Sequence, residues 1–193
     1  NTVWGHQWQL HYATPPTVDG KTVASPSGGG YYTMFGERHC SGSDAHQATI
    51  GIMIHEIGHD LGWPDLYDVS GATQGGVGVW SVMASGSWNY VSGQWPGARP
   101  PLPDAFSRSY QGWVTPTQVS GTNQSRNVPS ASTSSTVYRV LNNPGGVDWA
   151  FSNSGNQTGT GEYFLIENRT QTNWDASLPG CGILIWHIDE TRS

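Results

Sequence analysis

The pattern of apolar and polar positions predicts one well-defined helix in the first third of the chain. Isoleucine and leucine recur at the three- and four-residue spacing of a helix face, so a helix is predicted over about residues 45–61. The repeating positions are Ile50, Ile54, Ile57 and Leu61. Asp44 and Gln47 have the spacing of a capping box at its start, and Gly62 and Pro64 end it. The adjoining face is also apolar, so we expect the helix to be buried on most sides.

The remaining pattern predicts short strands and a β-rich second half. Residues 31–35 read as a short strand, and residues 104–111 as a short helix capped by Asp104. Three strands are expected later, at residues 138–141, 162–167 and 181–188. The last is a continuous apolar run, which is typical of a buried strand. The chain is therefore predicted to be one α+β domain over residues 1–193, with a β-rich subdomain over about 112–193.

The predicted helix carries the segment HEIGH at residues 55–59, which has the arrangement of a zinc peptidase site. His55 and His59 lie four residues apart, so their side chains are separated by about 40° around the helix. Both imidazoles can therefore reach one ion at about 2.0–2.1 Å. Glu56 is placed to accept a proton from the water that the metal activates and to pass it to the leaving amine. These roles require histidine, glutamate and histidine in that order.

The residues after His59 supply a third candidate ligand. Gly62 lets the chain turn sharply out of the helix, and Asp65 is then delivered to the metal. The fourth position stays open for water, as a catalytic site requires. Two other carboxylates compete for this role. Asp60 points elsewhere on the helix, and Asp68 also suits a loop-stabilising or calcium carboxylate.

A second signal lies in the segment WSVMASG at residues 80–86. Met83 follows Asp65 by 18 residues and is flanked by small, turn-forming residues. Metzincin peptidases place a methionine in such a turn beneath the metal, as an apolar floor. The competing interpretation is a methionine that fills a gap in the core. Beside the histidine motif, the segment favours a Met-turn.

Composition and charge narrow the function. Only 11% of residues are charged, whereas the chain holds 26 glycines and 10 tryptophans, which is typical of a rigid, loop-rich extracellular protein. A net charge of −6 argues against a nucleic-acid partner, and no apolar run is long enough to span a membrane. Cys40 and Cys181 favour one disulfide, which would close a loop of about 140 residues and stabilise by roughly 4–5 kcal/mol. Two free thiols are the alternative.

On these residues the chain resembles the immune inhibitor A family of secreted bacterial peptidases. Residues 55–68 are similar to the family's active-site stretch, and residues 80–88 to its Met-turn region. Shorter similar blocks lie at residues 3–6, 112–114, 166–169 and 186–190. The resemblance implies a metzincin-like fold, secretion, endopeptidase activity on extracellular protein or peptide substrates, one catalytic zinc ion (Zn2+) and often structural calcium (Ca2+).

Carboxylates outside the zinc ligands are candidates for calcium. Glu167 and Asp189 end two predicted neighbouring strands and could share an ion with loop oxygens. Asp68 is a third candidate, in the loop after the histidine motif. An ordinary surface pair is the alternative for Glu167 and Asp189.

The sequence departs from the family pattern in two ways. The family domain has further strands and the upper edge of the cleft upstream, so we expect a partial domain that has this upstream part as a partner. Some metzincins have a tyrosine two residues after the methionine, where this sequence has Ser85. Tyr90 is a weak candidate for the missing oxyanion stabiliser. The alternative function is a catalytically silent metzincin-like binding module, which the intact motif disfavours, or an inactive fragment.

Overall fold

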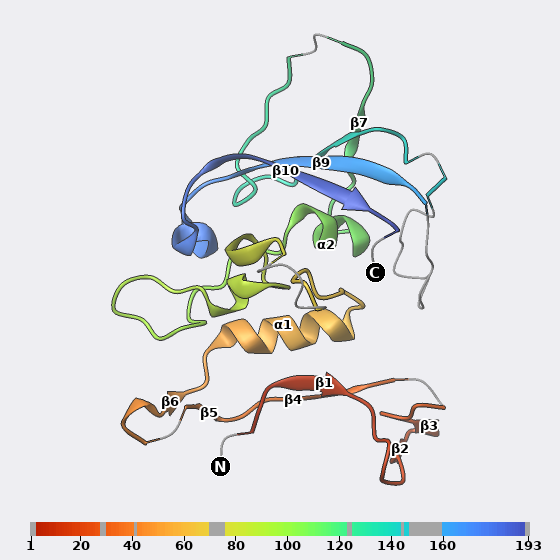
Figure 1. Ribbon diagram of the computed structural model, residues 1–193, viewed down its shortest axis with the longest axis vertical. Coiled ribbons are helices and arrows are strands. Elements are labelled where there is room, and N and C mark those ends of the chain that lie inside the picture. Colours follow the sequence, from red (N-terminus) through yellow and green to blue (C-terminus); the bar gives the residue numbers. More distant parts are fainter. Residues whose placement is uncertain are drawn as a thin grey trace.

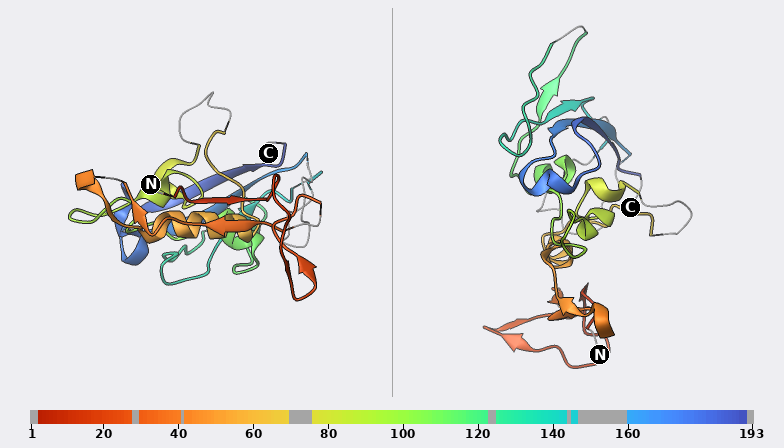
Figure 2. Two further views of the ribbon diagram at one scale, coloured as in Figure 1. Left: turned by 90° about the horizontal axis from the view of Figure 1, so that it is seen from below. Right: turned by 90° about the vertical axis from the view of Figure 1, so that its left-hand side faces the viewer.

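The computed structural model describes residues 3–27, 30–40, 42–69, 76–122, 125–143, 145–146 and 160–191. Its elements form layers on either side of helix α1 (Ile50–Asp60): paired short strands lie on one side, and helix α2 (Ala105–Tyr110) and a C-terminal sheet lie on the other (Figure 1). A view from the side keeps this order (Figure 2). The predicted mixture of helices and strands, with a β-rich second half, is confirmed. No helix in the described ranges is long and apolar enough to cross a lipid bilayer.

The strands fall into small N-terminal pairs and one larger sheet. The antiparallel pairs are β1 (His6–Trp8) with β4 (Tyr32–Met34), β2 (Thr17–Val18) with β3 (Lys21–Thr22), and β5 (Arg38–His39) with β6 (His46–Gln47). The C-terminal sheet contains β7 (Thr117–Val119), β8 (Tyr138–Val140), β9 (Glu162–Arg169) and β10 (Gly182–Asp189), in the order β10-β9-β8-β7. Strands β7 and β8 are parallel, and the other neighbours are antiparallel. Short 3-10 helices cover Gly42–Asp44, Gly78–Trp80, Ser85–Trp88 and Asn173–Ser177.

Helix α1 begins about five residues later than the sequence pattern predicts. Its N-cap residue is Thr49, and no side chain caps the first turn, so the capping box expected at Asp44 and Gln47 does not form. Gln47 instead pairs with Arg38 across strands β5 and β6. The backbone hydrogen bonds of this hairpin take the place of a first helical turn.

The helix is also less buried than its apolar pattern suggests. The buried residues of α1 are Gly51, His55, Glu56 and Gly58, whereas Ile57 is 46% exposed. The narrow pair β1 and β4 lies on the side of the helix away from the C-terminal sheet (Figure 1), and Ile50 and Ile57 remain exposed. The face of α1 that turns into the protein is therefore the face with the candidate site residues.

The core lies between α1 and the inner face of the C-terminal sheet. Its large members include Trp63, Met83, Phe106, Leu165 and Trp186. Helix α2 packs against β9 and β10, and the Asp104 carboxylate accepts a hydrogen bond from Ser107 N at its start. The predicted cap at Asp104 is confirmed. This core places the loop that contains Met83 between α1 and α2.

Strand β10 lies at the edge of the sheet, so the prediction of a buried strand is wrong. Leu184 and Trp186 pack on the core, whereas Ile183 and Ile185 are 52% and 66% exposed. An antiparallel sheet covered on one side has two different faces, even where the residues on both faces are apolar. The run of apolar residues therefore did not reveal the open face.

The predicted disulfide is also wrong, because Cys40 and Cys181 are both free and exposed. Cys40 directly follows β5 in the N-terminal layer, and Cys181 directly precedes β10 in the C-terminal sheet. Helix α1 lies between these layers (Figure 1). A disulfide needs Cα atoms about 5.5–6 Å apart, and side chains in opposite layers do not approach this closely.

Candidate metal centre

Two of the three candidate ligands come from the second half of α1, and a sharp turn brings the third. The helix ends in a Schellman motif, in which Trp63 N donates to Gly58 O and Gly62 N donates to His59 O, each at 2.9 Å. Gly62 has a φ of +86°, in the left-handed region that favours glycine. The chain therefore reverses directly after the helix, and Asp65 returns to the pair of histidines.

Hydrogen bonds to backbone carbonyls orient both histidines. His55 Nδ1 lies 2.9 Å from Val82 O, and His59 Nδ1 lies 2.8 Å from Trp63 O. A carbonyl only accepts, so each Nδ1 must carry the proton and donate it. Each Nε2 then keeps its lone pair whenever the ring is neutral. This is the tautomer that a metal-ligating histidine needs, and a backbone carbonyl is its usual partner.

The three candidate ligand atoms converge on one point. Asp65 Oδ1 lies 3.2 Å from His55 Nε2 and 3.3 Å from His59 Nε2. Among the described residues, these three form the one group of histidine, cysteine or carboxylate side chains whose ligand atoms all lie within 4.8 Å of one another. Asp65 Oδ1 is buried and has no hydrogen-bond partner within the described part of the chain. A cation between the three atoms would satisfy it, so the donor set fits a metal. We call these residues the histidine–aspartate cluster.

The pKa values of the cluster are shifted because the Asp65 carboxylate lies beside two imidazoles. Burial by itself would raise the pKa of Asp65, but the adjoining imidazoles of His55 and His59 hold it well below its usual range. Burial also lowers the pKa of His59, but the neighbouring Asp65 carboxylate and the hydrogen bond to Trp63 O outweigh it and raise the pKa overall. The protein thus keeps a carboxylate ionised at this point and attracts positive charge to it. A divalent cation satisfies that demand better than a proton does.

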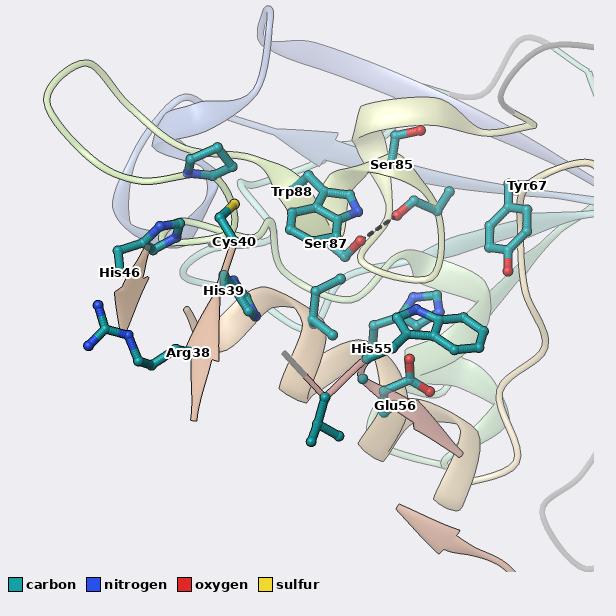
Figure 3. Close-up of a pocket in the computed structure, with 16 residues that line it drawn as sticks. Arg38, His39, Cys40, His46, His55, Glu56, Tyr67, Ser85, Ser87 and Trp88 are labelled. Carbon is teal, nitrogen blue, oxygen red and sulfur yellow. Dashed lines mark hydrogen bonds between the residues drawn. The ribbon is translucent and has the colours of Figure 1, made fainter. Parts of the chain in front are cut away.

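Glu56 and His55, one member of the cluster, border a cleft of about 680 Å3. His55, Glu56, Tyr67 and Trp88 are among its lining residues, and they come from α1, from the loop after Asp65 and from the segment after Met83. Figure 3 shows Glu56 beside His55, with the Tyr67 hydroxyl pointing down towards the same region. Glu56 is itself buried. The cleft therefore gives a substrate access to the cluster and to the adjacent carboxylate.

Tyr67 is a site residue that the sequence reasoning missed. Its hydroxyl donates a hydrogen bond to the Asp65 carboxylate, and its ring lies nearly parallel to that of His55, with centroids 6.3 Å apart. Burial and this carboxylate raise the pKa of Tyr67 to about 12, so the hydroxyl remains a donor at ordinary pH. Tyr90, the candidate from the sequence, is not among the residues that line the cleft. The position of Tyr67, two residues after Asp65, was the available signal.

Met83 packs directly against the core side of the helix that carries the histidines. It is fully buried, and a side chain at Gly58 would come within 2.5 Å of its sulfur. Two consecutive backbone carbonyls of this turn also contact the candidate site. Val82 O accepts a hydrogen bond from His55 Nδ1, and Met83 O accepts one from Leu66 N at 2.8 Å. The turn therefore touches two of the candidate ligands or their direct neighbours.

The other candidate carboxylates lie away from the cluster. Asp60 accepts a hydrogen bond from the Thr33 hydroxyl of β4, and Asp68 is not a member of the group that could hold a metal. Glu167 pairs with Leu184 across the β9–β10 ladder, and Leu184 lies five residues before Asp189 on β10. At about 3.3 Å per residue, the predicted calcium pair is separated by roughly 17 Å and cannot share one ion.

Two known proteins match parts of this chain. The chain is 32% identical to Immune inhibitor A of Bacillus thuringiensis subsp. alesti over 89 residues, which are 46% of this chain and 12% of that protein. It is 52% identical to the Pre-pro-metalloprotease PrtV of Vibrio cholerae over 42 residues, 21% of this chain and 5% of that protein. The matched part is thus a small fraction of either relative. No solved structure matches this chain.

A family match covers more of the chain than either relative does. Residues 1–116 match the family described as "Immune inhibitor A peptidase M6, catalytic domain", which is a family of zinc metalloproteases. The matched region is more than half of the 193 residues, and it contains the histidine–aspartate cluster, Glu56 and Met83. The chain therefore belongs to the immune inhibitor A (M6) family of peptidases.

Proposed function

We propose that this chain carries the catalytic centre of a zinc-dependent endopeptidase, with His55, His59 and Asp65 as the metal ligands and Glu56 as the general base. The observation that carries the proposal is the convergence of three ligand atoms around a buried carboxylate oxygen that lacks a hydrogen-bond partner in the described chain. Family membership supports zinc as the ion. Three protein ligands leave a position open, which distinguishes a catalytic zinc site from a structural one.

Each residue has a separate part in peptide hydrolysis. A bound zinc ion lowers the pKa of water and polarises the substrate carbonyl. Glu56 lines the cleft, accepts the proton of the attacking water and delivers it to the departing amine. The carbonyls of Val82 and Trp63 keep both histidines in the ligating tautomer. Tyr67 holds the Asp65 carboxylate by its hydroxyl, at the edge of the cleft.

We also infer a metzincin-like arrangement, with Met83 as the floor of the centre. The burial of Met83 against Gly58 of the active-site helix supports this inference. The family resemblance and the low fraction of charged residues support secretion and protein substrates outside the cell. In the described part of the chain no second group of potential metal ligands accompanies the cluster, so zinc alone is proposed.

Metal content and proteolysis together test the proposal. The wild-type chain should hold one zinc ion by elemental analysis and should cleave casein. Glu56→Ala should keep the zinc and lower the cleavage rate by about 10²–10⁴-fold, because it removes the general base and none of the ligands. His59→Ala should lose both zinc and cleavage.

Two outcomes would contradict the proposal in different ways. Stoichiometric zinc without wild-type cleavage would contradict the catalytic function and favour a binding module or an inactive fragment, while leaving the ligand assignment intact. Zinc binding that survives His59→Ala undiminished would remove the assignment of the ligands.

A further inference from the structure

The carboxylate of Asp104 does more than cap helix α2. It is fully buried and accepts three hydrogen bonds: from Ser107 N at 2.8 Å, from Ser107 Oγ at 2.9 Å and from Ser81 Oγ at 2.6 Å. The bonds from Ser107 satisfy the first turn of α2, as an N-cap normally does. The bond from Ser81 serves no capping role, because Ser81 lies 23 residues earlier in the chain, at the start of the turn that contains Met83.

The hydroxyl of Ser81 has a fixed orientation within this turn. It donates its only proton to Asp104 and accepts a hydrogen bond from Met83 N at 3.0 Å. Ser81 is fully buried, so no bulk water competes for either partner. Ser81 Oγ thus holds the turn by two hydrogen bonds, and its bond to Asp104 fixes its orientation.

The pinned turn presents two consecutive carbonyls to the metal centre. Val82 O receives the proton of His55 Nδ1 at 2.9 Å, and Met83 O receives Leu66 N at 2.8 Å, directly after Asp65. A shift of the turn would therefore move the first ligand and the third ligand together. His59 depends on Trp63 O instead and is independent of the turn.

Asp104 is itself held by a rigid support. Arg108 of the same short helix forms a buried ion pair with Glu167 of β9. Arg169 binds Glu167 at 3.2 Å and Asp175 at 2.5 Å, and all three of these side chains are fully buried. We call Arg108, Glu167, Arg169 and Asp175 the arginine cluster. Through it, a sheet that lies beyond the family match at residues 1–116 anchors the helix that positions the turn.

We propose that Asp104 and Ser81 are positioning residues of the metal centre, which act through the carbonyls of Val82 and Met83 on His55 and Asp65. The inference rests on the proposed function, because it assumes that these two side chains bind zinc. Hydrogen bonds that orient metal ligands typically change metal affinity or activity by about 10–100-fold when they are removed. The effect of Ser81 should lie in this range, although Ser81 touches no ligand.

The structure offers a matched pair of variants for the test. Ser81→Ala removes the oxygen that joins the turn to Asp104, whereas Ser107→Ala removes another hydroxyl bonded to the same Asp104 oxygen without touching the turn. The zinc dissociation constant is measured by competition with a chromophoric chelator, and the visible spectrum of the Co2+-substituted protein reports the ligand geometry. Thermal unfolding of the metal-free proteins shows whether each variant folds and how far it is destabilised.

Ser81→Ala should weaken zinc binding by about tenfold or more and alter the Co2+ spectrum, whereas Ser107→Ala should keep zinc affinity within about twofold. Asp104→Ser provides a second test, because serine still caps α2 but is too short to reach Ser81. It should weaken zinc binding as Ser81→Ala does. Equal zinc affinity in Ser81→Ala, Ser107→Ala and the wild type would overturn the positioning role. A wild-type chain that binds no zinc would instead overturn the proposed function.

Discussion

Two clusters of ionisable side chains, the buried arginine cluster and the partly buried histidine–aspartate cluster, differ in how their carboxylates are partnered. The arginine cluster contains its own cations: two arginines face two carboxylates, and Trp186 Nε1 donates a further hydrogen bond to Glu167 at 2.9 Å. The histidine–aspartate cluster has one carboxylate and no permanent cation. Every carboxylate oxygen of the first cluster accepts a hydrogen bond from the polypeptide, whereas Asp65 Oδ1 of the second has no donor among the described residues.

This difference indicates how structural and functional charge can be told apart in a single chain. A buried charge costs free energy unless it is paired, so a cluster that folds with every oxygen partnered needs no ligand. Asp65 Oδ1 has no hydrogen-bond partner among the described residues, whereas the carboxylates of the arginine cluster accept several. The orphaned oxygen lies among three converging ligand atoms, and this combination, rather than burial as such, supports the proposed site.

The largest loss of stability is expected when an arginine is removed from the arginine cluster. Arg169→Ala leaves Glu167 and Asp175 buried without their shared partner, and removing one partner of a buried pair costs about 3–5 kcal/mol. Urea unfolding of the metal-free protein should therefore show a large loss of stability. Arg38→Ala, at an exposed arginine, is the control and should cost less than about 1 kcal/mol. Equal losses in the two variants would contradict the comparison.

A smaller loss of stability is expected when zinc is removed from the histidine–aspartate cluster. A chelator such as EDTA should lower the free energy of unfolding of the zinc-loaded protein by roughly 2.7 kcal/mol when free zinc had been 100 times its dissociation constant. The measurement is thermal unfolding at several zinc concentrations. Arg169→Ala should lose stability at every zinc concentration, because its cluster does not use the ion. A melting temperature independent of zinc would show that the histidine–aspartate cluster is also complete by itself.

The smallest change in metal-free stability is expected from Asp65→Asn. The Asp65 side chain is 25% exposed and lacks a permanent cation, so its loss should change the stability of the metal-free protein by less than about 1 kcal/mol. The same variant should lose the stabilisation by zinc, since a neutral amide is a weaker ligand. Asp68→Asn is the matched control and should retain that stabilisation. Loss of the zinc response in Asp68→Asn alone would move the third ligand to Asp68.

The sequence revealed the parts of the site that local structure determines. Helical spacing places His55 and His59 on one face, and the left-handed Gly62 returns Asp65 within six residues of His59. These relations hold wherever a helix ends in this kind of turn, so no knowledge of the tertiary fold was needed. The cap at Asp104 was predictable for the same reason.

The features that the sequence did not reveal all depend on distant partners. The burial of β10 depends on what covers each face of its sheet. A disulfide between Cys40 and Cys181 depends on whether the N-terminal layer and the C-terminal sheet meet. Glu167 was a surface or calcium candidate because its partners Arg108 and Trp186 lie 59 and 19 residues away, although its third partner Arg169 is two residues along the same strand. The isoleucine spacing located the helix correctly but its inner face only in part: Ile54 and Leu61 pack against the core, whereas the buried residues of α1 are two site residues and two glycines.

The two hydrogen bonds that orient the histidines also imply an order of assembly. His59 finds its carbonyl four residues away, so the end of the helix alone can set this imidazole during folding. His55 finds its carbonyl 27 residues away, on a turn that Asp104 positions from still further along the chain. In a nascent or partly folded chain, the imidazole of His59 would therefore be oriented for metal binding before that of His55. Tight capture of zinc would then report that α1, the turn and α2 have all come together.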